Sequence, residues 1–352
     1  MACNQSDLTS GTMNVITPTN IQSASLSGST RLMVSDNPET LNSTTFNMSK
    51  GTLWHDYVNT SEAAVHHRVF GWHVNSTGGT IKLGLTIQNL SSTNSIELQN
   101  VERAKRSTNN GSQYITYVGQ CLAKSCLGGT LDTIKPVDKQ IGQQQVGLVE
   151  AYDVPNGYLI GFLFEFTISR YSGSGNINYR IRTVASKSTS DDLRNITSNP
   201  VPQDSKHSRG SWPQADIIGT TPTYTIGQTS STSISTQSID KLLTASSSYD
   251  SSNALDNTGQ YGATYLVQVP IKNNTSNTRT VRIRVNPRGG DYAGAVRIPD
   301  GSTYGIPLLR TSDPNVAHVM DYKASSGLAT VKFTVMHAGN SSTPLAIYLT
   351  TI

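Results

Sequence analysis

Charged residues are scarce in this chain. Only 14% of its 352 residues are Asp, Glu, Lys or Arg, against roughly 25% in an average domain, and the net charge is +4. The few lysines and arginines form no cluster of the kind that binds nucleic acid, so we expect no nucleic-acid partner. No apolar run approaches the ~20 residues that a membrane-spanning helix needs, so we also expect no membrane span.

A secretory leader is also missing from the start of the chain, because the residues after Met1 are rich in Ser, Thr and Asn. The chain is therefore either made without such a signal or is a mature form to which Met1 was added. The sequence does not decide between these two alternatives.

Cysteine is nearly absent, with only Cys3, Cys121 and Cys126 present. Three cysteines do not make the disulfide framework of a small secreted domain. Cys121 and Cys126 either close a short loop in an oxidising compartment or remain thiols. Cys3 lies in a polar tail, where it stays free or pairs between chains.

Motifs of known catalytic sites are missing as well. The chain has no Gly-x-Ser-x-Gly, no His-Glu-x-x-His and no phosphate-binding glycine-lysine loop. Glu150, Asp153 and Glu165 come nearest to a carboxylate group, but nothing places them at the ~5–10 Å separation of glycosidase pairs. We therefore predict that the protein is not an enzyme.

What the chain does contain is a series of short alternating stretches. Ile81, Leu83, Leu85 and Ile87 share one face and polar residues the other, which is typical of a half-buried strand. Turn signals recur every ~8–12 residues, and the best candidate for a helix, residues 254–261, is short. The fold class that we predict is all-β, with antiparallel sandwiches of the jelly-roll or immunoglobulin-like kind.

The strand pattern occurs twice along the chain. An apparent hairpin through 75–79 corresponds to one through 273–277, and each is followed by a matching pair of strands. We predict two tandem sandwich domains, each enclosing its own core. The predicted divisions are an N-terminal arm (1–28), domain 1 (29–199), a proline-containing linker (200–214) and domain 2 (215–352).

The N-terminal arm has two interpretations. A polar segment of low complexity is usually a flexible tail. The alternative is a strand lent to a neighbouring subunit, since Met13 to Ile16 can pair with a sheet edge.

Metal ligands are few. His67 and His73 share a strand face but lie roughly 20 Å apart at ~3.3 Å per residue, so a site at His55 and His67 needs further strands to complete it. Asp250, Asn253 and Asp256 offer oxygen ligands that Ca²⁺ prefers, although a polar loop with Asx turns explains them more simply. We expect no cofactor, with Ca²⁺ as the one ion to consider.

Sugar binding would require exposed aromatic side chains. Two arginine pairs, Arg180 with Arg182 and Arg282 with Arg284, could also bind an acidic polymer or glycan, although a solvated strand face explains them more simply. The aromatic candidates are Tyr114, Tyr117, Trp212, Tyr261, Tyr292 and Tyr304.

Four stretches carry a resemblance to known proteins: residues 31–39 (RLMVSDNPE), 51–54 (GTLW), 68–75 (RVFGWHVN) and 286–295 (NPRGGDYAGA). In this order they resemble extracellular β proteins of Gram-positive, spore-forming bacteria, some of which are known through an attached copper-amine-oxidase-type domain. The resemblance implies a secreted or surface protein. It implies no oxidase activity, because the chain has Asn178-Tyr179-Arg180 where the cofactor precursor needs Asn-Tyr-Asp/Glu, and no His-x-His.

These observations favour a non-enzymatic structural or interaction protein of an extracellular or surface assembly such as a layer, fibre or matrix. We expect a homo-oligomer or polymer located outside the cell or on the cell or spore surface. One alternative is a carbohydrate-binding pair of β-sandwiches. Another is a viral coat or fibre protein, which agrees with the missing leader.

Overall fold

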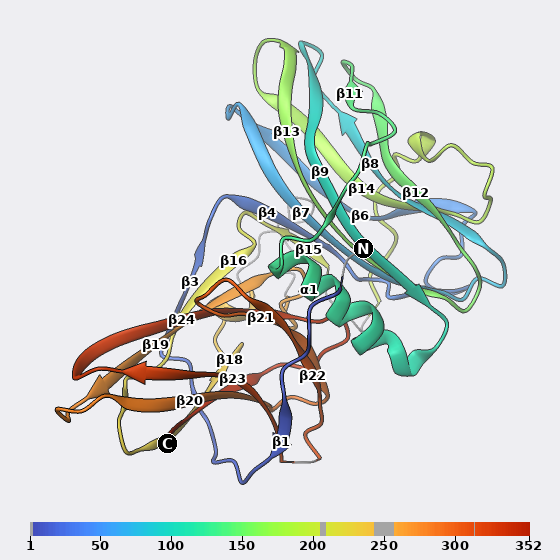
Figure 1. Cartoon of the computed structure of the whole chain (residues 1–352). Coiled ribbons are helices and arrows are strands. Elements are labelled where there is room, and N and C mark those ends of the chain that lie inside the picture. Colours follow the sequence, from blue (N-terminus) through green and yellow to red (C-terminus); the bar gives the residue numbers. More distant parts are fainter. Residues whose placement is uncertain (1–2, 205–208, 243–256, 313) are drawn as a thin grey trace.

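The computed structural model describes residues 3–204, 209–242, 257–312 and 314–352 (Figure 1). The chain is all-β, as predicted, and its strands form four sheets. Among the described residues, no helix combines the length and the apolar character that crossing a membrane would require.

The first half of the molecule has two sheets, built from strands β4 to β15. They are β4 (Thr30–Ser35), β5 (Thr40–Leu41), β6 (Lys50–Thr60), β7 (Ala64–Asn75), β8 (Ile81–Asn89), β9 (Asn94–Thr108), β10 (Asp132–Thr133), β11 (Gln140–Ile141), β12 (Val146–Val154), β13 (Leu159–Gly173), β14 (Ile177–Ser186) and β15 (Gly210–Trp212). One sheet has the order β12-β8-β14-β6. The other has the order β10-β9-β13-β7-β4-β15, with β11 also on β9 and β5 also on β7.

The second half has the other two sheets, completed by strands from the N-terminus. Its strands are β1 (Ser10–Thr12), β2 (Thr19–Asn20), β3 (Ser23–Ser27), β16 (Asp216–Thr220), β17 (Tyr224–Thr225), β18 (Thr229–Ile234), β19 (Thr264–Asn273), β20 (Arg279–Pro287), β21 (Tyr292–Arg297), β22 (Thr303–Leu309), β23 (Asn315–Ala324), β24 (Gly327–His337) and β25 (Leu345–Thr351). The sheet orders are β1-β23-β20-β25-β18-β2 and β22-β21-β24-β19-β16-β3, with β17 also on β19.

The strand order of the first half recurs in the second. The run β12-β8-β14-β6 corresponds to β23-β20-β25-β18, and β9-β13-β7-β4 corresponds to β21-β24-β19-β16. Within these corresponding runs the same pair of neighbours is parallel in both halves, β4 with β7 and β16 with β19. The pattern that repeats in the sequence is therefore also a repeated topology.

The two turns predicted as hairpins do not join paired strands. β7 and β8 lie in different sheets of the first half, and β19 and β20 lie in different sheets of the second. Turn residues reverse the chain but do not dictate which strand becomes the hydrogen-bonded neighbour. Here each reversal carries the chain from one sheet across to the other, so the hairpin prediction was wrong.

The core does not divide as expected. One apolar cluster fills the space between the two sheets of the first half and includes Leu83 and Phe164. The largest cluster, however, joins Phe70 and Trp72 of β7 to Val267 of β19 and the rest of the second-half interior. The larger sheet of the first half is thus buried on both faces. The first half encloses a cluster of its own, but the second-half cluster also extends onto the first half, which the sequence did not predict, because alternation shows which residues share a face but not what covers that face.

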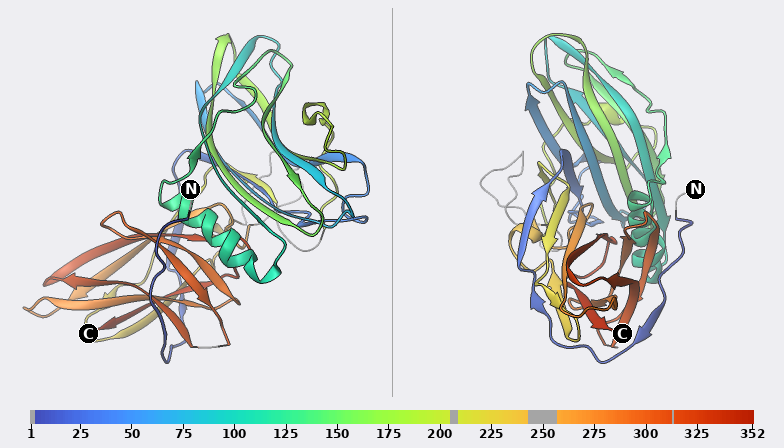
Figure 2. Two further views of the ribbon diagram at one scale, coloured as in Figure 1. Left: turned by 45° about the vertical axis from the view of Figure 1, so that its right-hand side comes forward. Right: turned by 60° about the vertical axis from the view of Figure 1, so that its left-hand side comes forward.

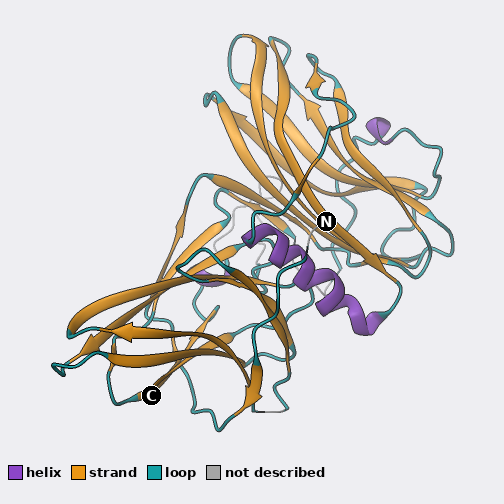
Figure 3. Cartoon of the chain, viewed as in Figure 1, coloured by secondary structure: helices purple, strands orange, loops and turns teal. Residues whose placement is uncertain are grey.

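A helical segment lies between the halves, where the sequence predicted none (Figures 2 and 3). Its successive turns are η1 (Gly111–Gln113), η2 (Tyr114–Gln120) and α1 (Cys121–Leu127). Val118 and Leu122 enter the core that the halves share, and Leu127 packs with Leu163 and Met336. Ile115 and Val118 belong to a strand-forming class of residue, so local preference hid a helix that tertiary packing stabilises. The helix candidate at 254–261 lies partly outside the described residues, and its described part is a turn.

The N-terminal segment, residues 3–27, belongs to the sheets of the second half. β1 pairs antiparallel with β23, β2 runs parallel to β18, and β3 pairs antiparallel with β16. Residues 13–16, the expected strand, lie between β1 and β2 and are not a strand. The segment is therefore not a loose tail, since its strands pair with β23, β18 and β16.

A disulfide joins Cys3 to Cys121, whose Cα atoms are 5.0 Å apart. Neither pairing considered from the sequence occurs: Cys121 bonds to the N-terminal segment of its own chain, and Cys126 is a free thiol. Residues five apart on a helix point in different directions, so Cys121 and Cys126 face different neighbours. The disulfide ties the start of the N-terminal segment to the helix between the halves.

The predicted linker packs tightly where it is described. β15 pairs with β4, and the Trp212 indole is buried in the shared core, where Nε1 donates to the carbonyl of Leu242 at 2.9 Å. The buried guanidinium of Arg209 donates to the carbonyls of Leu53 at 3.0 Å and Val201 at 2.8 Å. This part of the segment therefore extends a sheet of the first half.

Candidate functional site

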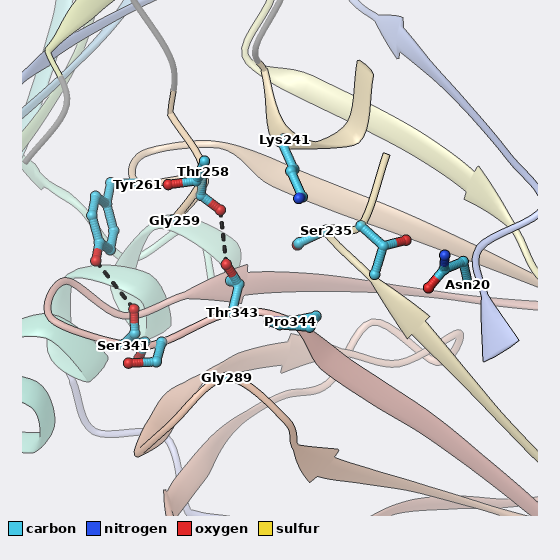
Figure 4. Close-up of a pocket in the computed structure, with 12 residues that line it drawn as sticks. Asn20, Ser235, Lys241, Thr258, Gly259, Tyr261, Gly289, Ser341, Thr343 and Pro344 are labelled. Carbon is cyan, nitrogen blue, oxygen red and sulfur yellow. Dashed lines mark hydrogen bonds between the residues drawn. The ribbon is translucent and has the colours of Figure 1, made fainter. Parts of the chain in front are cut away.

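A groove of about 610 Å³ opens at one end of the second half (Figure 4). Most of the residues that line it carry a hydroxyl group, and its shape comes from loops rather than from strand faces. The lining residues are Asn20, Ser235, Thr236, Lys241, Thr258, Gly259, Tyr261, Gly289, Ser341, Ser342, Thr343 and Pro344.

Six separate segments bring these residues together. They are the end of β2, the turn after β18, the short helix η4 (Ile239–Lys241), the turn before β19, the bend after β20, and the loop between β24 and β25. Because antiparallel neighbours place alternate ends of strands at the same edge, loops distant in sequence meet here. Among the described lining residues, Lys241 supplies the one group that is charged at neutral pH.

The loop between β24 and β25 forms the most firmly held wall. The Ser341 hydroxyl is buried, donates to the Ala293 carbonyl at 2.7 Å and accepts from the Ala293 amide at 3.1 Å. Tyr261 donates its hydroxyl to the Ser341 carbonyl at 3.1 Å, and the Thr343 hydroxyl donates to the Thr258 carbonyl at 2.8 Å. The Thr343–Pro344 peptide bond is cis. The four hydrogen bonds hold this wall of the groove in place independently of any ligand.

The Asn-Pro-Arg-Gly-Gly stretch noted in the sequence forms another wall. A Cβ atom on Gly289 would lie 1.7 Å from the Thr343 carbonyl oxygen, so only glycine allows the two loops to approach this closely. The Arg288 amide donates to the Pro344 carbonyl at 3.0 Å, and the Arg288 side chain reaches the carbonyl of Ile16. The stretch therefore joins the groove to the N-terminal segment.

Beneath the groove lies a buried histidine, His337, at the end of β24. Nε2 of His337 is 2.7 Å from Oε1 of Gln260, and Nδ1 is 2.7 Å from the Tyr292 hydroxyl. The ring therefore bridges Gln260 and Tyr292 through its two nitrogens. Burial lowers the pKa of His337 to about 3, which keeps the ring neutral at physiological pH.

Ser235, His337 and an aspartate, Asp240, lie close together, but they are not connected as a catalytic triad. The Ser235 hydroxyl lies 3.5 Å from Nε2 of His337. Asp240 accepts from the Ser235 amide at 2.9 Å and from the Tyr265 hydroxyl at 3.1 Å. In a catalytic triad the aspartate holds the other ring nitrogen of the histidine, but here that nitrogen faces the Tyr292 hydroxyl.

The histidines considered as metal ligands are buried in the first half. His67 pairs through Nε2 with the Tyr179 hydroxyl at 2.7 Å and stacks on Phe166, and burial lowers its pKa to about 3. Burial and the nearby Arg180 and Arg182 lower the pKa of His55 to about 3. Among the described residues no three His, Cys, Asp or Glu side chains are grouped to hold a metal. The Ca²⁺ candidates Asp250, Asn253 and Asp256 lie outside the described residues.

Two of the aromatic residues considered for sugar binding are unsuitable. Trp212 and Tyr292 are 1% and 0% exposed, so neither can present a ring to a ligand. Tyr261 does line the groove, with its ring stacked on Phe70. Tyr117 is exposed, but the Arg106 guanidinium covers its ring at 4.7 Å. Tyr114 and Tyr304 are partly buried against the shared core.

Of the two arginine pairs, Arg282 with Arg284 lies on a partly solvated face, whereas Arg182 of the pair on β14 is covered. Arg182 is 1% exposed, and burial followed by repulsion from Arg180 lowers its pKa to about 10. Arg282 forms a double hydrogen bond with Asp321, at 2.8 and 2.7 Å. Arg284 donates to the Thr350 hydroxyl at 3.1 Å. The alternating pattern of the sequence did not reveal that the face of β14 that carries Arg182 is covered.

The three carboxylates of the first half do not form an acid–base pair either. Glu150 pairs with Arg103 at 2.9 Å, and Glu165 pairs with Arg68 at 2.7 Å. Asp153 is exposed near the end of β12.

Sequence reasoning missed the residues that shape the groove, above all Asp240, Gln260, His337 and Ser341. They come from separate loops and match no motif. Two features of the sequence could have indicated the position of the groove. They are the Asn-Pro-Arg-Gly-Gly stretch and the run of small polar residues before Pro344. Both are turn signals, and turns at one edge of a sandwich are where binding sites commonly form.

No protein-family model and no curated protein matches this chain. Among solved structures, the chain is similar to part of the McoA multicopper oxidase from the hyperthermophile Aquifex aeolicus, with 11% sequence identity and a TM-score of 0.12. That match covers 77% of this chain, which spans about half (48%) of the oxidase chain. A likeness at this TM-score assigns neither fold nor chemistry to this protein.

Proposed function

We propose that this chain is a non-enzymatic structural protein of an extracellular or surface assembly, built from two tandem β-sandwich domains. The observation that carries the proposal is the apolar core that continues from Phe70 and Trp72 in the first half to Val267 in the second. A shared core opposes relative motion of the two halves, as a building block under load requires. The domain limits that we propose remain 29–199 and 215–352.

Two further features support this function. The Cys3–Cys121 disulfide is of the kind that persists outside a reducing cytosol. In the cluster beside the groove, Nδ1 of His337 faces the Tyr292 hydroxyl while Asp240 bonds to Ser235 and Tyr265, so the aspartate does not orient the histidine as in a catalytic triad.

Assembly is tested by multi-angle light scattering and negative-stain electron microscopy of the purified, oxidised chain over a hundredfold range of concentration. We expect the mean mass to rise with concentration and regular particles, layers or fibres to appear. A single monomeric mass across the whole range, with no ordered particles, would show that the proposal is wrong.

A second candidate function is glycan binding, which the groove specifically favours. Hydroxyl groups, the Asn20 amide and the Lys241 ammonium line it, and sugars are bound by such groups. A glycan array of the wild-type chain tests this idea, with Ser342→Trp to fill the groove and Asn274→Trp in a distant exposed loop as the matched control. We expect binding that Ser342→Trp abolishes and Asn274→Trp leaves intact. An array with no bound glycan, or equal binding by both variants, would remove the candidate.

A further inference from the structure

The N-terminal segment covers three sheet edges of the second half. β1 and β2 lie at the two opposite edges of one sheet, and β3 lies at an edge of the other. An open sheet edge is a template for pairing with another chain, so whatever occupies these edges decides whether copies of the protein associate. In Figure 1 the segment runs down past β1, turns around the lower end of the second half and returns upward through β3 to reach β4.

Backbone hydrogen bonds attach the segment to these edges, beside the Cys3–Cys121 disulfide and apolar contacts of Leu8, Ala24 and Leu26. The Leu8 amide donates to the Gly305 carbonyl at 2.8 Å, and the His318 amide donates to the Thr9 carbonyl at 2.9 Å. All residues of β1 and β2 are exposed. In the described part of the segment, Ile21 is the one apolar side chain that is fully buried in the core, with 1% exposed. Such main-chain pairing is made equally well by the same segment of an identical chain.

The segment meets the rest of the chain through a very short connection. β3 ends at Ser27 and β4 begins at Thr30, so Gly28 and Ser29 alone join a strand of the second half to a strand of the first. Gly28 has a φ of +77°, which glycine adopts without strain. Short connections of this kind favour exchange of a terminal element between copies, because opening them extends the chain and leaves the pairing unchanged.

From these observations we propose that the N-terminal segment is exchanged in the assembly, so that β1, β2 and β3 of one copy occupy the edges of a second copy. This inference rests on the proposed structural function and names the element that would join the copies. The surface involved is the outer edges of β23, β18 and β16, and the partner is a second copy of this chain.

Cys3 moves with the segment. In an exchanged pair, Cys3 of one copy meets Cys121 of the other, and the two thiols give two protons and two electrons to a small-molecule disulfide such as oxidised glutathione. The product is the same bond as in the single chain, but it now links two copies. Assembled wild-type protein should therefore contain covalent dimers or longer ladders on a non-reducing gel.

The direct test uses two populations that each carry one new cysteine, with all three native cysteines replaced by serine. One carries Thr12→Cys and the other Asn315→Cys, at positions that pair between β1 and β23. The two are unfolded together, refolded as a mixture and oxidised. With equal amounts mixed at random, we expect a covalent heterodimer in about half of the exchanged pairs, because the new thiol on β1 of one copy then lies opposite the new thiol on β23 of the other.

A matched pair controls for random oxidation. Arg282→Cys and Asp321→Cys face each other between β20 and β23, both of which follow the segment in sequence and are not exchanged. Mixing these two populations should give no heterodimer above background. If the Thr12→Cys and Asn315→Cys mixture also gives none, the exchange is wrong.

A third variant separates the two proposals. A chain that carries both Thr12→Cys and Asn315→Cys forms an intrachain disulfide if the segment pairs with its own chain. It forms an interchain disulfide if the segment is exchanged. Ordered assemblies whose chains all run as monomers on a non-reducing gel would overturn the exchange but leave the structural function standing. The absence of any assembly, with intrachain bonds only, would overturn both.

Discussion

The Arg68 guanidinium of β7 joins the two halves through Asp216 of β16. Its Nη1 atom lies 3.5 Å from Oδ1 of Asp216, and its Nε atom donates to Glu165 at 2.7 Å. The Arg68 side chain is 9% exposed and the two carboxylates about a third exposed. Burial alone would lower the pKa of Arg68, but the acidic groups around it raise the pKa above its ordinary value. A buried cation is thus held at the boundary between the halves.

Replacing this cation should weaken the union of the halves. In Arg68→Met both carboxylates lose their partner, and we expect a loss of about 2 kcal/mol in the free energy of unfolding. This is below the 3–5 kcal/mol of a fully buried pair, since solvent reaches Glu165 and Asp216. Arg282→Met is the matched control, because its partner Asp321 is at the surface, and it should cost under about 1 kcal/mol. Urea unfolding measures both, and equal midpoints would contradict the prediction.

Acid should destabilise the protein through its buried histidines. Burial lowers the pKa of His67 and His337 to about 3 and that of His73 to about 4, against ~6.5 in an unfolded chain. The unfolded state therefore binds more protons between about pH 3 and 6.5, so stability is complete above pH 6.5 and falls as the pH is lowered. We expect Tm to fall steadily from pH 7 to pH 4.

The contribution of a single ring can be isolated. His337→Gln should reduce the pH dependence by about one proton, or about 1.4 kcal/mol per pH unit between pH 6 and 4. Tyr292→Phe removes the hydroxyl that faces the ring but leaves the buried imidazole, so it should lower Tm and keep the slope. Urea unfolding at several pH values measures this, and identical slopes for the two variants would count against a neutral His337.

Thiol chemistry should follow the cysteine arrangement. Cys126 is free, and burial raises the pKa of its thiol to about 12. We expect no thiol to react with Ellman's reagent in the native protein, one per chain in denaturant, and three in denaturant after reduction. Rapid reaction of one thiol in the native state would show that Cys126 is accessible.

The Cys3–Cys121 disulfide closes a loop with a sequence separation of 118 residues. Cys3→Ser should therefore lower the free energy of unfolding by about 2–4 kcal/mol. Cys126→Ser is the matched control, because Cys126 lies in the same helix as Cys121 but forms no disulfide. This variant should retain the oxidised chain's faster migration on a non-reducing gel. An unfolding midpoint for Cys3→Ser equal to that of the wild type would contradict the prediction.

The close approach of loops at the groove gives another test. Gly289→Ala places a Cβ against the Thr343 carbonyl, so one loop must move, and we expect a loss of about 2 kcal/mol or more. Gly111→Ala, where a Cβ would meet nothing within 4 Å, should change stability by under about 0.5 kcal/mol. Thermal unfolding compares the two variants, and a Gly289→Ala protein as stable as Gly111→Ala would show that the wall is adaptable.

Periodicity along the chain was enough to predict the strands and their repetition. Alternation such as Ile81, Leu83, Leu85 reflects a two-residue geometry that needs no distant partner, and the structure places β8 there. The same local preference failed at residues 114–127. There Val118 and Leu122 form a helix because they pack between the halves, a contact that lies far away in sequence.

The groove could not be predicted in the same way. Gly289 and Ser341 are ordinary turn residues until the ends of β20 and β24 bring their loops within contact distance. Likewise, nothing near Cys3 in the sequence indicates Cys121 as its partner, because the fold of the whole intervening chain sets that distance.

The sequence by itself determined the all-β class, the repeated order of strands and the scarcity of charge, since each follows from preferences of single residues and near neighbours. Only the tertiary structure decided that the N-terminal segment completes the second half, that the second-half core extends onto a sheet of the first half, and that six segments form a groove. These features depend on which surfaces bury one another, and that choice is made by the free energy of the whole chain and not by any local pattern.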